Sequence, residues 1–466
     1  ALNPPTMEAS IREDSSWSCV HGIERWRSDC GCNSGRDGWH QRWRAPLRAA
    51  FDWLRDTVNP AFESTAAKLL KDPWAARDDY IEVILDRSPA TIDSFIARNA
   101  RADLSEHDRG TILRLMELQR HAMLMYTSCA WFFDDIGGIE TVQVIQYAAR
   151  VIQLARLALG LELEEEFLSR LADCPGNTRE MPDGRIVYEK AVRPATLSLD
   201  RVAAHCAVQR LFEAPSEEVY SFDVLDRTDQ RLTSGRSSLV IGHATFRSRI
   251  DTESAHLTYC AVRTADHTVA CGIRPFGGDD TFNAVRNRAT EAFDRADFAG
   301  ILRLIDQEFG GARYSIASLF RDEQHRIVRE MLRPSLAQID ASYQQIYDQH
   351  APMARFLRSL SLTVPRRIRM IGSFVLSQSI RQILESPAPD LDRASELVDE
   401  AAREGIELDK DTTTIALAAA MRTTIARPIE SHTDRIDRAH EIDTLVAFTE
   451  KLSFPAALWP LQEYYL

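Results

Sequence analysis

The stretch SEHDRGTILRLMELQRHAMLMYTSCAWFFDDIGGIETVQVIQYAARVIQLARLALG, residues 105–160, determines what kind of fold the chain can adopt. Ser105 and Asp108 have the spacing of a capping box, which marks the start of a helix. Apolar residues then recur at intervals of three and four, as on one face of a helix. After a break at 134–138, a second helix is predicted over 139–160, and it is apolar on nearly all sides. We therefore expect it to lie deep inside a helical bundle.

Helical spacing also begins near residue 45 and returns after residue 278. Between 220 and 273 the period changes to two, which predicts a small antiparallel meander with short links at 251–254 and 265–267. A meander of this size needs helices to pack on. The expected fold is mainly α, a helical bundle with an inserted small antiparallel β meander followed by a second helical region, and α+β overall. The expected regions are a Trp- and Cys-rich segment (1–44), the bundle (45–215), the meander (216–278) and the C-terminal helices (279–466).

The composition favours a soluble globular protein, since 44% of the 466 residues are hydrophobic and 27% are charged. A chain of this length accommodates roughly two to four domains. The formal net charge is −13 and no long Lys/Arg cluster interrupts it, so we expect no nucleic acid partner. No run approaches the roughly 18 apolar residues that predict a membrane span, so no membrane partner is expected. Scattered cysteines in a chain that needs no disulfides suit a reducing cytoplasm.

The segment SWSCVHGIERWRSDCGCNSGRDGWHQRW, residues 16–43, is the first candidate for a functional site. Its glycines interrupt any regular period, so we expect a loop, and loops held on a rigid scaffold often carry sites. Aromatic rings can cover the C–H faces of a sugar while charged groups bind its hydroxyls. The alternative is a structural loop that caps a helical core. The candidate substrate-binding residues in it are Trp17, His21, Glu24, Arg25 and Trp26.

Cys19, His21, Cys30 and Cys32 in the same loop are also candidates for metal binding. Paired zinc ligands usually have two to four residues between them, whereas only one residue separates the members of each pair here. Four ligands could still close a site, and a metal or redox role remains an alternative. The spacing nevertheless predicts no stoichiometric metal, and no cofactor is expected.

Three consecutive aromatic residues followed by two carboxylates, at 131–135, mark a second candidate site at the break between the two long helices. One of these aspartates could simply cap the next helix. Alternatively, Trp131 or Phe132 could be a stacking platform, with Asp134 or Asp135 accepting hydrogen bonds from ligand hydroxyls. We expect this segment and the 16–43 loop to form one site. The sequence contains no serine-hydrolase, P-loop, dinucleotide-binding or metalloprotease signature.

Several long motifs carry a family resemblance. They are SSWSCVHGIERWRSDCGC (15–32), WHQRWRAPLRAAFDWLRD (39–56), DPWAARDDYI (72–81), ELQRHAMLMYTSCAWFFDDIGGIETVQVIQYAARVIQLA (117–155), YSIASLFRDEQHRIV (314–328) and LWPLQEYYL (458–466). They resemble the C-terminal region, classed as domain of unknown function 3536, of bacterial proteins related to glycoside hydrolase family 57. The resemblance covers essentially the whole chain.

This resemblance implies a two-part protein for the hydrolysis or transfer of α-glucans. An N-terminal (β/α)7-type barrel carries the catalytic carboxylates, and a helical region helps to close its cleft. An aromatic segment of the helical region borders the sugar, and TSCAWFFDD at 127–135 matches it best, although its aspartates follow the tryptophan instead of preceding it. The first dozen residues resemble the final edge of the barrel. The start ALNPPTMEAS, without initiator Met or leader, predicts a piece of a longer polypeptide.

The barrel motifs with the catalytic pair are not in this sequence. Retaining hydrolysis needs two carboxyl groups roughly 5–5.5 Å apart, whereas Asp134 and Asp135 are adjacent and point different ways in most backbones. We therefore assign no catalytic residue and expect this chain alone to be inactive. The favoured function is an accessory region that contributes substrate-cleft residues, with an α-glucan or oligosaccharide and the barrel as partners. The alternative is a helical interaction or scaffold module without a sugar-binding role.

Overall fold

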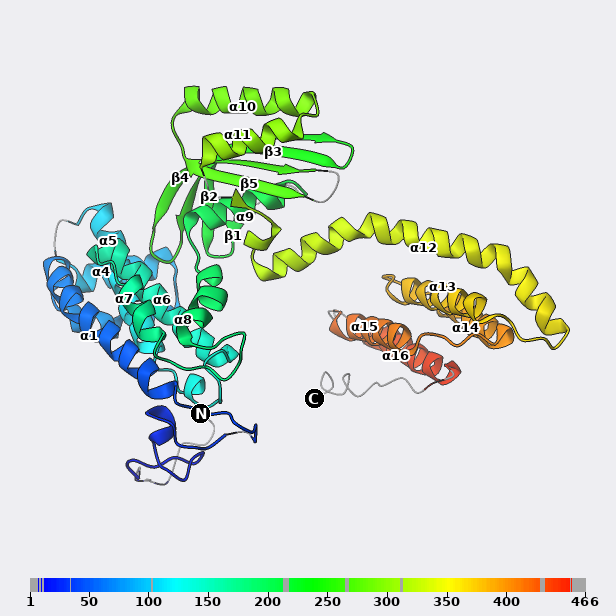
Figure 1. Cartoon of the computed structure of the whole chain (residues 1–466), viewed down its shortest axis with the longest axis horizontal. Helices are drawn as coiled ribbons and strands as arrows, with labels where there is room; N and C mark the ends of the chain where they lie inside the picture. The colour runs from blue at the N-terminus through cyan, green and yellow to red at the C-terminus, as the bar shows by residue number, and fades with distance from the viewer. Residues whose placement is uncertain are drawn as a thin grey trace. The chain divides into compact units, whose positions relative to one another are not determined.

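The computed structural model describes residues 7, 10, 12–33, 35–101, 104–212, 218–264, 268–310, 313–427, 432–452 and 454. The chain divides into two compact units, Ala1–His325 and Arg326–Leu466 (Figure 1). The barrel edge expected in the first dozen residues lies almost wholly outside the described residues. In the part of the chain that is described, no helix combines the length and apolar character needed to cross a membrane.

The N-terminal part of the first unit is a helical bundle. Its helices are α1 (Arg44–Leu69), α2 (Pro73–Asp79), α3 (Ile81–Leu85), α4 (Pro89–Asn99), α5 (Glu106–Leu124), α6 (Ile139–Leu159), α7 (Glu164–Leu171), α8 (Gly184–Val187) and α9 (Leu199–Arg210). Short turns add η1 (Glu24–Trp26), η2 (Ser128–Trp131), η3 (Tyr188–Val192) and η4 (Arg193–Ala195). The predicted helical fold of this region is confirmed.

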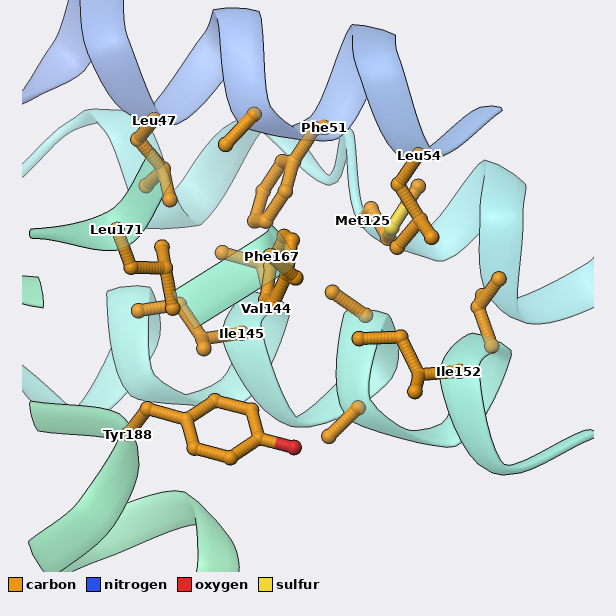
Figure 2. Packing of buried hydrophobic residues seen from close by; sticks show 14 of the residues in the cluster. Leu47, Phe51, Leu54, Met125, Val144, Ile145, Ile152, Phe167, Leu171 and Tyr188 are labelled. Carbon is orange, nitrogen blue, oxygen red and sulfur yellow. The ribbon is translucent and has the colours of Figure 1, made fainter. Parts of the chain in front are cut away.

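Helix α6 lies in the centre of the bundle, as its apolar composition predicts. Val144, Ile145 and Ile152 of α6 face Phe51 of α1 and Phe167 of α7 across a continuous apolar core (Figure 2). The rings of Phe51 and Phe167 stack with their centroids 6.2 Å apart. The capping box that opens α5 is also present, since the Ser105 side chain accepts from the backbone of Asp108 and the Asp108 side chain accepts in return.

A six-stranded antiparallel sheet follows the bundle, with its strands in sequence order. The strands are β1 (Glu218–Val219), β2 (Phe222–Ser234), β3 (Ser237–Ser248), β4 (Ser254–Arg263), β5 (Val269–Pro275) and β6 (Arg313–Tyr314). The predicted meander is thus confirmed, and the link at 251–254 joins β3 to β4. The link predicted at 265–267 lies outside the described residues.

Helices cover both faces of the sheet. Leu239 and Ile241 of β3 pack against α10 (Asp279–Asp294) and α11 (Phe298–Phe309), which lie on one side (Figure 1). On the other side Ser238 donates a hydrogen bond of 3.3 Å to the carbonyl of Leu211, just after α9. Gly272 of β5 permits close packing, because a Cβ there would lie 2.6 Å from that of Phe309. The two helices therefore pack on the sheet, within the compact unit that ends at His325.

An ion pair joins the bundle to the sheet. Arg150 of α6 donates to Asp251 after β3 at 2.7 Å, and the Asp251 side chain is completely buried. Burial alone would raise the pKa of Asp251, but the charge of Arg150, together with hydrogen bonds from Ser248 and the backbone of Glu253, lowers the pKa. The bundle and the sheet are thus held by a charged contact as well as by apolar packing.

The second unit is helical throughout its described residues. It contains most of α12 (Arg321–Ser359), with α13 (Arg366–Leu384), α14 (Leu391–Glu404), α15 (Lys410–Ala426) and α16 (His432–Lys451). Its own core includes Leu376, Ile380 and Leu417. A second helical region is therefore present as predicted.

Candidate functional site

The N-terminal loop lies against the break between α5 and α6. Arg25 donates from Nη1 to the carbonyl of Phe132 at 3.0 Å, and its guanidinium lies 4.6 Å from the centre of the Phe132 ring. Trp26 donates from Nε1 to the carbonyl of Ser128 at 3.3 Å. The structure thus brings together the two segments that the sequence analysis expects to form one site.

Buried hydrogen bonds fix the backbone of the helix break from below. Trp43 donates from Nε1 to the carbonyl of Asp134 at 3.0 Å, and Arg44 donates from Nη2 to the carbonyl of Phe133 at 3.2 Å. Gln41 donates to the carboxylate of Asp134 at 3.2 Å. Because Trp43, Arg44 and Gln41 are fully buried, this floor is a rigid part of the bundle.

A third segment, the loop between α7 and α8, completes the floor through Asn177. Its side chain donates to the carbonyls of His40 and Asp134, both at 3.0 Å, and accepts from the backbone of His40 at 3.0 Å. Its backbone N–H donates to Asp135 at 2.8 Å. Sequence analysis missed Asn177, whose only signal is its place after Pro175 and Gly176 in a turn.

Above this floor an open cleft of about 600 Å³ lies between the loop and the helix break. Its lining combines three kinds of group: the aromatic residues Trp39, Phe132 and Phe133, the cations Arg25 and Arg36, and the carboxylates Asp134, Asp135 and Glu140. The guanidinium of Arg36 lies 4.3 Å from the centre of the Trp39 ring. Arg36, Trp39 and Phe133 lie within the segments singled out in the sequence but were not among the predicted binding residues, and Glu140, which follows the second segment, was not predicted either.

The position of Trp131 corrects its predicted role as a stacking platform. Its side chain is 0% exposed and belongs to the core of the bundle. Its ring stacks on Trp43 at 6.0 Å between centroids and meets Phe51 edge-on at 6.1 Å. A ring enclosed in this way has no face for a ligand.

The two aspartates serve mainly the loop itself. Asp134 is buried and accepts from Gln41, and Asp135 accepts from the backbone N–H groups of Asn177 and Gly137. Neither caps α6, whose N-cap is Gly138 without a side-chain hydrogen bond. They line the cleft and present it with negative charge, so the capping role is corrected and the predicted acceptance of hydrogen bonds from a ligand stays a prediction.

The other predicted residues lie near the cleft rather than in its wall. Trp17 is 93% exposed, and its ring stacks beside Phe132 at 6.3 Å. Glu24 accepts from the hydroxyl of Ser28 at 2.8 Å, and Trp26 packs on the bundle. His21 turns toward the cysteines. Of the nine predicted residues, Arg25, Phe132, Asp134 and Asp135 line the cleft.

The loop also gathers four groups that could hold a metal ion. One ligand atom from each of Cys19, His21, Cys30 and Cys32 lies within 4.8 Å of the others. The side chain of Arg44 donates from Nη1 to the sulfur of Cys30 at 3.4 Å. The one-residue spacers therefore do not keep the four groups from converging.

A smaller cavity of about 250 Å³ lies between the bundle and the sheet. Its charged lining includes Glu117, Arg120, Arg150 and Asp251. These groups pair with one another, since Arg120 donates to Glu117 at 3.1 Å and Arg150 donates to Asp251 at 2.7 Å. This pairing indicates a structural junction, so the cleft is the better candidate for binding.

A family described as "Domain of unknown function (DUF3536)" matches residues 39–320. The chain belongs to this family. The DUF3536 match begins at Trp39 in the cleft wall and includes the helix break, and it ends close to the end of the first unit. The cysteine cluster and the second unit lie outside it. No curated protein and no solved structure matches the chain.

Proposed function

We propose that this chain is the non-catalytic, helical part of an α-glucan-active protein of the family-57 type, and that its cleft contacts the sugar. The observation that carries the proposal is the lining of one open cleft by aromatic rings together with cations and carboxylates. The sequence resemblance to the region that follows the family-57 barrel gives the sugar class. The described family itself has no assigned function.

The cleft offers the two kinds of contact that a glucan needs. Phe133 is 44% exposed and meets Phe132 edge-on at 5.4 Å, which forms an apolar lip for the C–H face of a sugar ring. Arg36, held over Trp39, can donate to hydroxyls as a planar fork. Glu140 at the start of α6 can accept from them.

The cleft supports binding better than catalysis. A retaining glycosidase needs an ionised nucleophile and a protonated acid about 5–5.5 Å apart across the bond. Asp134 and Asp135 instead accept hydrogen bonds from the floor of the cleft. The proposal therefore leaves the bond-breaking step to a barrel of the kind that the resemblance implies.

Glucan binding tests the proposal directly. Maltoheptaose is titrated into the purified chain, with calorimetry and ¹H–¹⁵N spectra as readouts. We expect millimolar or tighter binding, weakened about 2- to 10-fold by Phe133→Ala, as the loss of one aromatic contact predicts. Phe356→Ala is the matched control, because Phe356 is an exposed phenylalanine of the second unit. The proposal would be contradicted if no binding were detected at a maltoheptaose concentration 20 times higher than about 1 mM. It would also be contradicted if Phe133→Ala and Phe356→Ala weakened binding equally.

One observation favours the alternative function, an interaction module. Helix α12 exposes Leu332, Leu336, Ile339, Tyr343 and Ile346, which recur at intervals of three and four. Such a stripe is typical of a helix that pairs with another helix. Sedimentation of the chain and of Ile339→Glu tests this function. Self-association that is lost in Ile339→Glu would support the interaction function. A wild-type chain that stays monomeric at protein concentrations about 100 times above the nanomolar range would exclude pairing of two copies.

A further inference from the structure

The cysteine-rich loop arranges four side chains around one point. The sulfur atoms of Cys19 and Cys32 are 3.9 Å apart, and Nδ1 of His21 lies 3.6 Å from the first and 3.5 Å from the second. The ligand atom of Cys30 also lies within 4.8 Å of all three. The outermost of the four residues, Cys19 and Cys32, are 13 positions apart in the sequence. Their convergence therefore requires the fold of the loop.

These distances match the edges of a tetrahedral zinc site. With Zn–S of about 2.3 Å and Zn–N of about 2.0–2.1 Å, a regular tetrahedron has S–S edges of about 3.8 Å and S–N edges of about 3.6 Å. The three measured edges are 3.9, 3.6 and 3.5 Å. A disulfide would instead hold two sulfurs about 2.05 Å apart, and all of these cysteines are free.

The backbone explains how one-residue spacers bring the pairs together. Gly31, between Cys30 and Cys32, has φ of +74°, and Gly22 after His21 has φ of +67°. Residues with a side chain rarely adopt this conformation. A side chain at Gly22 would also collide with the carbonyl of Asp14, since a Cβ there would lie 2.2 Å from its oxygen. The chain therefore turns sharply beside each ligand pair.

The surroundings also suit a negatively charged metal site. Three thiolates and one neutral imidazole around Zn²⁺ carry a net charge of −1. Arg44, whose side chain is fully buried, donates to the sulfur of Cys30 at 3.4 Å and places a positive charge beside the ligands. Hydrogen-bonding partners of this kind orient metal ligands and compensate their charge.

We propose that the sulfur atoms of Cys19, Cys30 and Cys32 and Nδ1 of His21 bind one Zn²⁺ as a closed, structural site. The cysteines lose their protons to solvent on binding, and no water or substrate position remains on the metal. The site ties the otherwise irregular loop to the start of α1 through Arg44. It acts on the shape of the loop and stands independently of the sugar-binding function proposed above.

Metal content tests the site. Untagged protein, purified with reductant and without chelators, is analysed by elemental mass spectrometry. We expect about one zinc per chain, reduced at least fivefold in Cys30→Ser and Cys32→Ser. Cys129→Ser is the control, because Cys129 is an exposed cysteine outside the cluster and should leave the zinc content unchanged.

Two further measurements keep the result independent of folding defects. Cobalt added to metal-free wild-type protein should give the intense visible bands of tetrahedral thiolate coordination, and zinc should protect three thiols from alkylation. The proposal would be overturned if the wild type held no more zinc than Cys30→Ser after refolding with zinc, if it held one iron per chain in its place, or if a disulfide formed among the three cysteines. No sugar is present in these assays, so failure of glucan binding does not affect their outcome.

Discussion

The two cavities of the first unit differ in how their charges are satisfied. At the junction of bundle and sheet, carboxylates meet arginines, as Asp251 meets Arg150 at 2.7 Å. At the cleft, Asp135 is held by backbone N–H groups, while arginines lie against aromatic rings. At the junction the charged groups pair with one another, whereas at the cleft guanidinium and aromatic surfaces remain at the cavity wall. The presence of charged groups in a cavity therefore does not mark a binding site. Whether those groups are paired with one another distinguishes a structural junction from a candidate site.

The largest effect is expected at the junction. Arg150→Ala leaves the carboxylate of Asp251 buried without its arginine, and loss of one partner of a buried pair costs about 3–5 kcal/mol of unfolding free energy. Urea unfolding followed by tryptophan fluorescence measures it, since all tryptophans except Trp459 lie at residues 17–131 in the first unit. A loss of unfolding free energy below about 1 kcal/mol would contradict the distinction between the paired charges of the junction and the groups of the cleft.

The same variant should change the dependence of stability on pH. In the wild type the pKa of Asp251 is lowered, so its contribution to stability is present above the unfolded pKa of about 3.9 and is lost as pH falls through the folded pKa. Without Arg150, the largest cause that lowers this pKa is lost, so the pKa of Asp251 rises relative to the wild type and protonation relieves part of the penalty as pH falls. The difference between wild type and variant should therefore be larger at pH 7 than at pH 4.

The second effect concerns the core beneath the cleft. Trp131→Ala removes a fully buried ring stacked on Trp43, and such truncations cost about 3–5 kcal/mol. Binding of maltoheptaose per folded molecule should change little if the floor retains its backbone. Unfolding and binding are measured on the same sample. A stable variant that no longer binds glucan would restore the predicted role of Trp131 as a platform.

A smaller effect is expected for the floor of the cleft. Asn177→Ala removes side-chain hydrogen bonds to His40 and Asp134, and leaves the part-buried carbonyl of His40 without that partner while Asp134 keeps its bond from Trp43. The expected loss is about 1–3 kcal/mol. Asn287→Ala, an exposed asparagine on α10, serves as control and should stay within about 0.5 kcal/mol.

The smallest change in stability is expected at the cleft wall. Phe133→Ala should alter the unfolding free energy by less than about 1 kcal/mol, because the ring is 44% exposed and fills no enclosed core. Its effect should appear in glucan binding instead. A loss of stability as large as that of Trp131→Ala would show that both rings are structural.

The sequence predicts regular elements well where one pattern dominates. Helix α6 was predictable because its sequence is apolar on nearly all sides. The capping box of α5 was predictable because it is a local side-chain motif with one interpretation. The second half of β2 and the first half of β3 were missed. Residues Leu239 to Ile241 of β3 are buried on both faces by helices, so the alternation that signals a strand is absent there.

The site was predictable in its segments but not in its side chains. Both the 16–43 loop and the 127–135 segment were recognised as irregular and aromatic, and they do meet. Which ring of Trp131, Phe132 and Phe133 faces the core depends on one 3-10 turn, η2, which no periodicity reveals. The convergence of the cysteine cluster was not predictable from the spacing within each pair, because two glycine turns bring the pairs together.

Arg44 gives one last consequence. Its two terminal nitrogens serve different partners, the sulfur of Cys30 and the carbonyl of Phe133, from the first residue of α1. A lysine has a single ammonium and cannot reproduce that fork. Loop, helix break and helix start are thus joined through one planar group, and should open as one cooperative unit. Amide hydrogens in the loop, such as those of Trp26 and Gly22, should then exchange with solvent at rates near those of the first turn of α1.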